Sequence, residues 1–348
     1  MEVKKFILSH NKKIVDALEK LNKIKEGINL TLFVYDNDKK IIGSITDGDI
    51  RRSLIEDKDI NKRLGEICFR DFTYILDSKK FVDLEFARRK EIKVLPVLNN
   101  DLTLNRIIDL DKTKGILPLD CVIMAGGRGK RLSPLTDITP KPMLLLGDKP
   151  IIEHTIDRLI SFGIRKFFVS LNYLGEKIQS YLGDGSSKGI EIEYVWEENP
   201  LGTAGSLSLI KEFNSDHVLI MNADLFTDVN FEKMYNTLIN EKADMVVASK
   251  NYKVDVPYAI FENKNNRVSG FKEKPSFIFN SNAGIYIVNK QLIDSIPKNS
   301  FYNITDLMYL IIRENKKLIH EPILGYWVDI GSTNDYQNAQ ELIKHLKR

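Results

Sequence analysis

The residues best suited to chemistry lie in one string near the middle of the chain. An apolar run, Cys121–Ala125, leads into Gly126-Gly127-Arg128-Gly129-Lys130-Arg131, and Pro140-Lys141-Pro142 follows shortly after. Glycines let backbone N–H groups approach anionic oxygens closely, and arginine and lysine supply positive charge. The string therefore predicts a cradle for a chain of phosphates, in which the next segment opens a helix whose N-terminus favours anions. The expected backbone contacts are Ala125, Gly126, Gly127 and Gly129.

This spacing differs from the common phosphate-binding fingerprints. It lacks the G-x-G-x-x-G order and the lysine-serine/threonine pair of the P-loop. A plain strand-to-helix turn would explain the glycines alone. The whole string, with Pro-Lys-Pro downstream, resembles the sugar-1-phosphate nucleotidyltransferases. The resemblance implies an enzyme that joins a nucleoside triphosphate to a sugar 1-phosphate and releases pyrophosphate, with Arg131 on the leaving phosphates and Lys141 on the α-phosphate.

Composition excludes several classes of protein. The 348 residues are 43% hydrophobic and 28% charged, with a net charge of +3, which favours a globular protein without a nucleic-acid or membrane partner. Two cysteines, Cys68 and Cys121, cannot form a disulfide framework or a cysteine zinc site. The start has no signal-peptide core and no apolar run is long enough to span a bilayer, so we expect a cytoplasmic protein. We also expect a homo-oligomer.

The chain divides into two parts with different patterns. In residues 1–111 the apolar spacing indicates a helix, two strands and a second helix, an order that then recurs. Residues 112–118, with Gly115 and Pro118, form the expected linker. The expected strands are Leu30–Tyr35, Ile41–Thr46, Lys93–Leu98 and Leu102–Ile107, with helices around Ile14–Leu21, after Thr46 and around Phe81–Ala87. The repeat resembles a tandem CBS pair, also called a Bateman module.

The stretch Gly43–Asp49 carries this resemblance most clearly. In CBS domains the Thr-x-x-Asp position commonly binds an adenosine ribose, so the resemblance implies an adenine nucleotide at Thr46 and Asp49. A helix cap made by Thr46, Asp47 and Asp49 explains the same residues equally well. The matching stretch of the second half, Leu102–Asp109, lacks the glycine and threonine, which favours one site per pair.

Residues 119–348 alternate apolar strands with amphipathic helices. This order predicts an α/β fold with an open, mixed but mostly parallel sheet, as in the GT-A-like (Rossmann-type) nucleotidyltransferases that the glycine string resembles. Ligands of such sheets lie at the carboxyl ends of the strands. The expected strands are Cys121–Ala125, Lys166–Leu171, Glu191–Val195 and His217–Met221, and the expected helices are Ile151–Phe162, Gly175–Leu182, Gly205–Phe213 and Phe231–Glu241.

The segment Glu197–Ala204 follows one strand and looks like the family's base-reading loop. The resemblance assigns Glu197, Pro200, Gly202 and Thr203 to the nucleotide. A carboxylate at Glu197 can accept hydrogen bonds from N1 and the exocyclic amine of guanine and would repel the carbonyl oxygens of uracil or thymine. GTP is therefore the first choice of nucleotide. A solvent-facing acidic pair, Glu197-Glu198, is the alternative.

Two carboxylates follow strands elsewhere. Asp224 ends Asn222-Ala-Asp, and Asp329 lies in Trp327-Val-Asp. In the families that this chain resembles, two such aspartates hold Mg²⁺, which binds few carboxylates and completes its shell with phosphate oxygens and water. Each aspartate alone could instead cap the segment that follows it, a helix near Ser332 in the case of Asp329.

The sugar half of the site is expected further along the chain. The resemblance places Ala259, Glu273, Asn282 and Gly284 on the sugar and Lys274 on its phosphate, whereas the Lys-Glu-Lys run by itself also fits a solvated strand end. The whole chain resembles the CBS-containing guanylyltransferases of bacterial nonulosonic-acid (legionaminic) pathways for cell-surface glycans, which implies glucosamine 1-phosphate and GDP-glucosamine.

Two alternatives come from other functional classes. One is a regulator in which a CBS sensor is fused to a non-catalytic transferase domain. The presence of all the charged positions of the site argues against this alternative. The other is a glycosyltransferase that uses a preformed nucleotide sugar. That class usually carries D-x-D after a strand, whereas Asp224-Leu-Phe does not continue to an acid.

Overall fold

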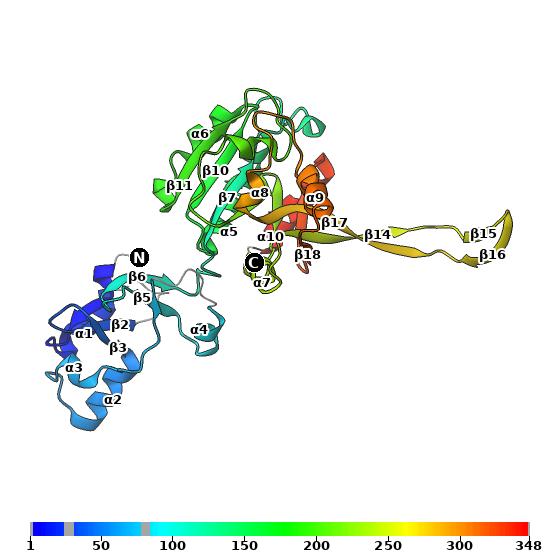
Figure 1. Ribbon diagram of the computed structural model, residues 1–348. Helices are drawn as coiled ribbons and strands as arrows, with labels where there is room; N and C mark the ends of the chain where they lie inside the picture. Colours follow the sequence, from blue (N-terminus) through cyan, green and yellow to red (C-terminus); the bar gives the residue numbers. More distant parts are fainter. Residues whose placement is uncertain (1–2, 24–30, 78–83, 347–348) are drawn as a thin grey trace. The chain divides into compact units, whose positions relative to one another are not determined.

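The computed structural model describes residues 3–23, 31–77 and 84–346. The chain forms two compact units (Figure 1). One comprises Met1–Leu117 with Ser161–Gly163, and the other comprises Pro118–Ile160 with Ile164–Arg348. No helix among the described residues combines the length and apolar character needed to cross a bilayer.

The N-terminal unit contains two small sheets with the same strand order. In each, a parallel pair is followed by an antiparallel pair. The first sheet is β1 (Ile7–Ser9), β2 (Thr31–Tyr35) and β3 (Ile41–Thr46), and the second is β4 (Ile75–Leu76), β5 (Val94–Leu98) and β6 (Leu104–Asp109). The helices are α1 (Ile14–Lys23), α2 (Asp47–Asp57), α3 (Leu64–Ile67) and α4 (Glu85–Arg89).

The expected elements of this unit are present, with one difference. Leu30 and Phe81, at the ends of an expected strand and helix, lie outside the described residues. The second half was expected to end in a helix, but a turn follows β6 in the described chain. Gly115 and Pro118 come within a few residues of this turn, and both are poor helix formers.

The second unit is built on a seven-stranded sheet. Its order is β11-β10-β7-β12-β17-β14-β18, and β17 runs antiparallel to both its neighbours while the other pairs are parallel. This confirms a mixed, mostly parallel sheet. The strands are β7 (Leu119–Met124), β10 (Lys166–Leu171), β11 (Glu191–Trp196), β12 (His217–Asn222), β14 (Met245–Asp255), β17 (Ser276–Asn289) and β18 (Leu318–Pro322).

The strand order reverses beside β7. The chain moves from β7 to β10 and β11 on one side and then returns to β12 on the other. Connections therefore leave the carboxyl ends of β7 and β12 in opposite directions, which opens a crevice between them. Apolar residues fill both faces of these strands, as expected for parallel strands covered by helices, and Val122, Phe168 and Ile220 share one buried cluster.

Helices connect many of these strands along the chain. They are α5 (Ile151–Ser161), α6 (Gly175–Leu182), α7 (Phe231–Asn240), α8 (Lys290–Ile293), α9 (Ile304–Arg313) and α10 (Thr333–Leu346). Short strands outside the main sheet are β8 (Leu145–Leu146), β9 (Lys149–Pro150), β13 (Leu225–Thr227) and β19 (Trp327–Asp329), which form two antiparallel pairs.

Two expected helices are wrong. The segment after the glycine string makes a single 3-10 turn, Lys130–Leu132, because Pro134 lacks an N–H group and disfavours helical backbone at the residue before it. Gly205–Phe213 is also reduced to a 3-10 turn, Gly205–Leu209. There the Ser208 hydroxyl donates to the Gly205 carbonyl (2.7 Å), a local bond that competes with a longer helix.

A long two-stranded ribbon projects from the sheet. The second half of β14 and the first half of β17 pair beyond the other strands, and β15 (Ile260–Lys264) and β16 (Arg267–Lys272) continue the ribbon to its tip (Figure 1). Residues 250–280 are mostly exposed. We call this segment the arm.

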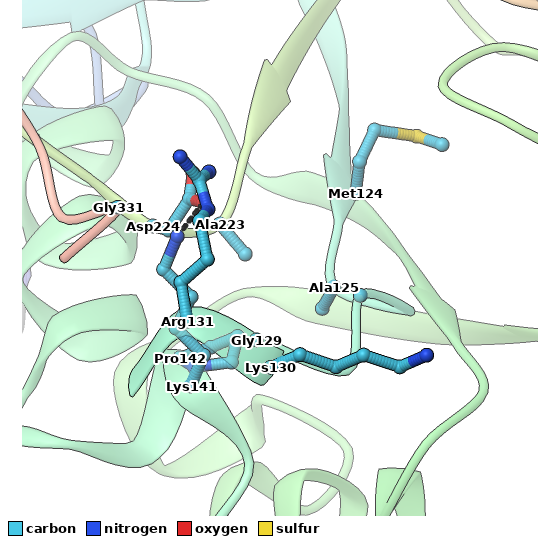
Figure 2. A pocket seen from close by; sticks show the side chains of 11 residues that line it. Met124, Ala125, Gly129, Lys130, Arg131, Lys141, Pro142, Ala223, Asp224 and Gly331 are labelled. Carbon is cyan, nitrogen blue, oxygen red and sulfur yellow. Dashed lines mark hydrogen bonds and ion pairs between the residues drawn. The ribbon is translucent and has the colours of Figure 1, made fainter. Parts of the chain in front are cut away.

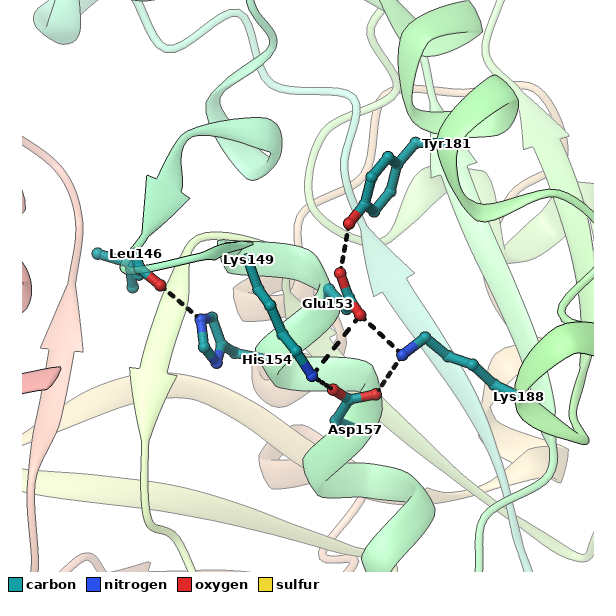
Figure 3. Close-up of polar contacts among 7 residues, drawn as sticks. All are labelled: Leu146, Lys149, Glu153, His154, Asp157, Tyr181 and Lys188. Atoms are coloured by element: carbon teal, nitrogen blue, oxygen red, sulfur yellow. Dashed lines mark hydrogen bonds and ion pairs between the residues drawn. The ribbon is translucent and has the colours of Figure 1, made fainter. Parts of the chain in front are cut away.

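An ionic cluster joins α5 to its surroundings (Figure 3). Lys188 donates to Glu153 (2.8 Å) and Asp157 (2.6 Å), Lys149 donates to Asp157 (2.6 Å), and the Tyr181 hydroxyl donates to Glu153. Burial alone would raise the pKa of Glu153 and of Asp157, but these hydrogen bonds lower both below their ordinary values of 4.5 and 3.8. The cluster therefore stabilises the fold only while the carboxylates are ionised.

The pKa shifts of the cluster predict an acid-dependent loss of stability. A lowered carboxylate pKa contributes stability above the ordinary pKa, and the contribution disappears as the pH falls through the lowered value. Glu153→Gln should cost about 1 kcal/mol at pH 7, which lowers the melting temperature of the second unit by ~2–4 °C. Calorimetry from pH 7 to pH 3 should show the difference shrinking below pH ~4.5.

A neighbouring ion pair offers a matched control. Glu191 accepts from Lys166 (2.5 Å), but its side chain is 65% exposed, so solvent screens the pair. Glu191→Gln should change the melting temperature less than Glu153→Gln. An equal effect of both variants, or a Glu153→Gln effect that persists at pH 3, would contradict this account.

Candidate functional site

A cavity of about 240 Å³ opens at the carboxyl ends of β7 and β12, where the strand order reverses (Figure 2). Open α/β sheets bind ligands at this position. The residues that line the cavity come from the glycine string, the Pro-Lys-Pro turn and the two carboxylate segments. They are Met124, Ala125, Gly127, Gly129, Lys130, Arg131, Lys141, Pro142, Ala223, Asp224 and Gly331.

The glycine string is shaped by close packing against Lys141. Gly129 has φ +63°, and a Cβ atom added there would lie 3.1 Å from the Lys141 Cβ. The buried Thr136 hydroxyl donates to the Gly129 carbonyl (2.9 Å) and fixes the turn. A larger residue at Gly129 would be strained by its backbone and would push Lys141 out of place.

The four cations expected around the phosphates do not all point into the cavity. Arg131 lies against Gly331, where an added Cβ would be 3.4 Å from a guanidinium nitrogen. Lys141 is only 8% exposed and points to Asp224. In Figure 2 the Lys130 side chain extends away from both. Arg128 lies over the Tyr173 ring, 5.2 Å from its centre. Arg131 and Lys141 therefore lie at the carboxylate end of the cavity, while Lys130 lines another part of its wall.

A short ladder brings the two carboxylates together. β13 pairs with β19 so that Leu225 lies opposite Asp329, and the Ile330 N–H donates to the Asp224 carbonyl (3.1 Å). Lys141 Nζ donates to Asp224 Oδ2 and lies 3.9 Å from Asp329 Oδ1. One ammonium group thus faces two carboxylates.

Burial affects the ionisation of this cluster of two carboxylates and two cations. Burial and the nearby Asp224 carboxylate raise the pKa of Asp329, and Lys141 and Arg131 offset the effect only in part. Asp224 Oδ1 is buried and has no hydrogen-bond partner in the described part of the chain. No group in the described residues donates to this oxygen, so it is available to bind a cation or a water molecule.

A divalent cation fits this donor set. Mg²⁺ binds through one or two carboxylates and fills its remaining positions with phosphate oxygens and water. The described residues contain no group of three or more His, Cys, Asp or Glu side chains that could hold a metal by themselves. The capping alternative for Asp329 finds no support, because Ser332 caps α10 by accepting from the Asp335 N–H (3.3 Å).

The expected base loop lies beside the glycine string. Glu197 is 8% exposed, so the solvent-facing alternative is wrong for this residue. One carboxylate oxygen accepts from the Ser170 hydroxyl and the other from the Leu201 N–H (2.9 Å). A Cβ atom added to Gly126 would lie 3.1 Å from Glu197 Oε1. The nearby loop therefore needs glycine at residue 126.

The rest of the base loop is held from the other side by the start of α9. Gly202 has φ +79°, and an added Cβ would lie 2.7 Å from the Tyr302 carbonyl oxygen. The Thr203 hydroxyl accepts from the Ile304 N–H (2.9 Å). These contacts leave Pro200, which is exposed, on the solvent side of the loop.

Two of the expected sugar residues lie next to the carboxylate segment. Gly284 has φ +71°, and an added Cβ would lie 2.7 Å from the Asn222 side-chain nitrogen, two residues before Asp224. Asn282 accepts from the Gly284 N–H and the Tyr286 hydroxyl, both at 2.9 Å. Their position therefore agrees with a ligand that reaches from the cavity towards β17.

The fold does not bring the other three residues expected to bind the sugar phosphate to the cavity. Ala259, Glu273 and Lys274 lie on the arm, close to where β15 and β16 begin and end. Glu273 and Lys274 are exposed, and Ala259 is half-buried.

The N-terminal unit has a cavity of its own, of about 420 Å³. Thr46 lines it together with Phe33, Ser44 and residues from Lys90 to Val94. Thr46 and Asp49 form the helix cap that the sequence offered as an alternative, since the Thr46 N–H donates to Asp49 (2.8 Å). Asp49 also accepts from Arg52 (2.6 Å), and it does not line the cavity.

Three residues of the site escaped sequence reasoning. Ser170 anchors Glu197, Gly331 packs against Arg131, and Asn222 packs against Gly284. Asn222 stands within the first carboxylate motif and Gly331 follows the second by two residues, so their positions in the sequence were a usable indication. Ser170 lies inside an apolar strand without any distinguishing pattern.

Comparison with known proteins agrees with this geometry. The model of the nucleotidyl transferase family matches residues 120–345. The D-glycero-α-D-manno-heptose 1-phosphate guanylyltransferase of Aneurinibacillus thermoaerophilus is 30% identical over 234 residues, which span 65% of this chain and 99% of that protein. The mannose-1-phosphate guanylyltransferase catalytic subunit beta of Drosophila melanogaster is 31% identical over 222 residues. These span 62% of this chain and 60% of the fly protein, so the match covers about three fifths of its length.

Solved structures share the fold. A putative glucose-1-phosphate thymidylyltransferase from Bacillus anthracis has a TM-score of 0.52 and 24% identity, over 64% of this chain and 94% of that one. HddC from Yersinia pseudotuberculosis, complexed with GMP-PN, has a TM-score of 0.51 and 22% identity, over 65% of this chain and 99% of that one.

The buried position of Lys141 predicts that it binds phosphate. Lys141→Ala should weaken the affinity for a magnesium–nucleoside triphosphate by about 10- to 100-fold, because a charge-assisted hydrogen bond is lost. Calorimetric titration measures the change, and Lys211→Ala is the control because that lysine is exposed and does not line the cavity. Equal losses in both variants would contradict the assignment of Lys141 to the cradle.

Proposed function

Because the chain belongs to the nucleotidyl transferase family, we propose that it transfers a guanylyl group from GTP to a sugar 1-phosphate. One observation carries the proposal. A phosphate cradle, a buried lysine and Asp224 line a single cavity at the switch point of the sheet, and Asp329 lies 3.9 Å from the same lysine. Such a site has positive charge for a triphosphate and a place for a metal beside it.

The proposed reaction forms one phosphorus–oxygen bond at the α-phosphate and breaks another. A phosphate oxygen of the sugar 1-phosphate attacks the α-phosphorus of GTP in line, the bond to the β-phosphate breaks, and pyrophosphate leaves with the electron pair. The attacking oxygen is already ionised near neutral pH, so the site needs no general base. Its work is positioning and the stabilisation of charge.

The cavity residues divide this work among them. Arg131 holds the leaving β- and γ-phosphates, and Lys141 holds the α-phosphate. Asp224 and Asp329 would hold Mg²⁺, which neutralises charge on the transferred group. The raised pKa of Asp329 and the unpartnered oxygen of Asp224 support this role, since a bound cation favours the ionised carboxylates.

Guanine is the proposed base for two reasons. The relatives compared above are named guanylyltransferases. In addition, Glu197 is held beside Gly126, where its carboxylate can accept from the N1 and exocyclic amine of guanine or set the loop that does so. Pro200, Gly202 and Thr203 complete the base loop.

The proposed sugar is glucosamine 1-phosphate, which gives GDP-glucosamine. This choice rests on the resemblance of the whole chain to CBS-containing guanylyltransferases, while the relatives are named for mannose and heptose phosphates. Asn282 and Gly284 would contact the sugar from β17. Ala259 and Glu273 would contact it from the arm, and Lys274 would pair with its phosphate.

The N-terminal unit is proposed to be a CBS pair that binds an adenine nucleotide. Its two sheets share one strand order, and Thr46 borders a cavity between elements of the two halves. The ribose would lie near Thr46 and Asp49. Binding there would regulate the transferase rather than take part in its chemistry.

A pyrophosphate-release screen tests the proposed function. The full-length protein with Mg²⁺ should release pyrophosphate from GTP only when a sugar 1-phosphate is present, fastest with glucosamine 1-phosphate, and adenine nucleotides should change the rate. A protein that binds adenylates but releases no pyrophosphate with any combination would be the non-catalytic regulator. Turnover of a preformed GDP-sugar without pyrophosphate would make it a glycosyltransferase.

Base selection is predicted to depend on Glu197. Glu197→Gln keeps the shape and one acceptor but loses the negative charge, so the ratio of kcat/KM for GTP over UTP should fall by about 10-fold. Glu198→Gln is the matched control, because Glu198 is the exposed neighbour on the same loop. An unchanged ratio in Glu197→Gln, or an equal fall in Glu198→Gln, would count against base reading by Glu197.

A further inference from the structure

The arm leaves the molecule at the same edge as the candidate site. β17 runs antiparallel to β12, so its N-terminal half extends beyond the carboxyl end of β12, where Asp224 lies. Figure 1 shows the ribbon of β14 and β17 continuing outward to β15 and β16. The arm therefore carries Ala259, Glu273 and Lys274 away from the cavity that holds their expected partners.

Lys274 cannot reach its own cavity. β17 runs from Ser276 to Asn289, and Gly284, two residues beyond Asn282, lies against Asn222 of the carboxylate segment. At ~3.3 Å per residue, the strand alone separates Ser276 from Asn282 by about 20 Å. A lysine side chain is much shorter than this distance.

The hydrogen-bonded ladder between β14 and β17 also prevents the arm from folding back onto the cavity. β14 and β17 stay in register from the pair Ser249–Asn282 to the pair Asp255–Ser276. Val256 N–H then donates to the Pro275 carbonyl (3.0 Å). To bring Lys274 to Asp224 within one chain, many of these hydrogen bonds would have to break.

One face of the arm is apolar and exposed. Opposite residues of an antiparallel pair point to the same face, and Tyr252 pairs with Phe279 while Val254 pairs with Phe277. These four side chains, which we call the apolar strip, are 62%, 56%, 37% and 38% exposed in that order. Phe277 and Phe279 stack with ring centres 6.5 Å apart.

Such a strip requires a partner. Isolated two-stranded ribbons are marginal in water, and contiguous exposed apolar surface marks an interaction site. Further out, Phe261 pairs with Phe271, and both are more than half exposed. The arm thus has apolar contact surface along most of its length.

The body offers a surface of the same kind beside the site. α9 begins at the base loop, where the Ile304 N–H donates to Thr203, and it exposes Tyr309 (73%) and Ile312 (58%). Phe301, just before this helix, is 65% exposed. An arm that arrives from another molecule would find apolar side chains next to the nucleotide site.

We propose that two copies of this chain exchange arms, so that the arm of each subunit completes the sugar-phosphate half of the other subunit's site. The proposal rests on the proposed function, since it assigns Lys274 to the sugar phosphate. Lys274 then meets Lys141, Asp224 and Asp329 of the second copy, and a two-fold axis makes the two sites equivalent. Each site is incomplete without the other subunit.

Mixing two inactive variants tests the exchange. Lys274→Ala removes the arm's cation, and Asp224→Asn removes a carboxylate from the body without changing its shape. Each variant alone should lose most pyrophosphate release. When the two full-length chains are coexpressed, a mixed dimer should hold one intact site, made from the Lys274→Ala body and the Asp224→Asn arm. Random pairing makes half of the dimers mixed, and each mixed dimer has one of its two sites intact, so the whole preparation should show about a quarter of the wild-type activity per chain.

The outcomes separate exchange from a site within one chain. Recovered activity supports exchange, and Arg131→Ala should complement Lys274→Ala in the same way, which guards against misfolding of Asp224→Asn. An active wild type whose variants never complement overturns exchange and leaves the proposed function standing. So does an active wild type that is monomeric by light scattering, or a Lys274→Ala variant with full activity.

A thiol cross-link tests the exchange without using activity. Both native cysteines are buried, so introduced thiols react first. A short bismaleimide should join Lys274→Cys of one chain to Lys130→Cys of a differently tagged chain. A cross-link found only within doubly substituted single chains, or no cross-link between chains, would overturn the exchange. If the wild type releases no pyrophosphate with any substrate, the proposed function fails and this cross-link alone decides whether arms are exchanged.

Discussion

The ion pair of Lys141 with Asp224 is the interaction on which the rest of the site depends. A lysine that is only 8% exposed faces Asp224 and, at 3.9 Å, Asp329. The same lysine packs against Gly129, so the phosphate cradle and the carboxylates are held by one side chain. Burial and the neighbouring Asp224 carboxylate raise the pKa of Asp329 despite Lys141 and Arg131, and the two adjacent carboxylates make this end of the cavity suitable for a metal beside an anionic substrate.

Two features of the tertiary structure produce this arrangement: the order of the central strands and a short ladder outside the main sheet. The order β10-β7-β12 opens the sheet between β7 and β12, which places the glycine string beside Asp224. The β13–β19 ladder then brings Asp329 from near the end of the chain. Buried parallel strands make the edge rigid, because apolar side chains fill both of their faces. A rigid edge can hold charged groups at fixed distances, which is the main requirement of phosphoryl transfer.

The arm imposes a different constraint, which concerns where its residues can be placed. The regular ladder between β14 and β17 beyond Ser249 and Asn282 keeps the arm extended, and the residues at its far end are therefore directed outward. If the arm enters a second subunit, the aromatic strip gains a partner and the sugar-phosphate lysine gains a site. Dimerisation and catalysis would then depend on the same surface, and the expected homo-oligomer would have a chemical reason.

The sequence by itself determined most helices and strands, because apolar periodicity, glycine and proline act through local backbone geometry. Its glycine and charged motifs determined the reaction class through their resemblance to a known family. It misjudged the segments after Gly129 and Gly205, where proline and serine end the helix early. It also left open whether Glu197 faces solvent, which the bonds from Ser170 and Leu201 decided. Only the tertiary structure could decide that Asp329 joins Asp224 while Lys274 does not, because strand pairing and strand length set the distances between residues far apart in the chain.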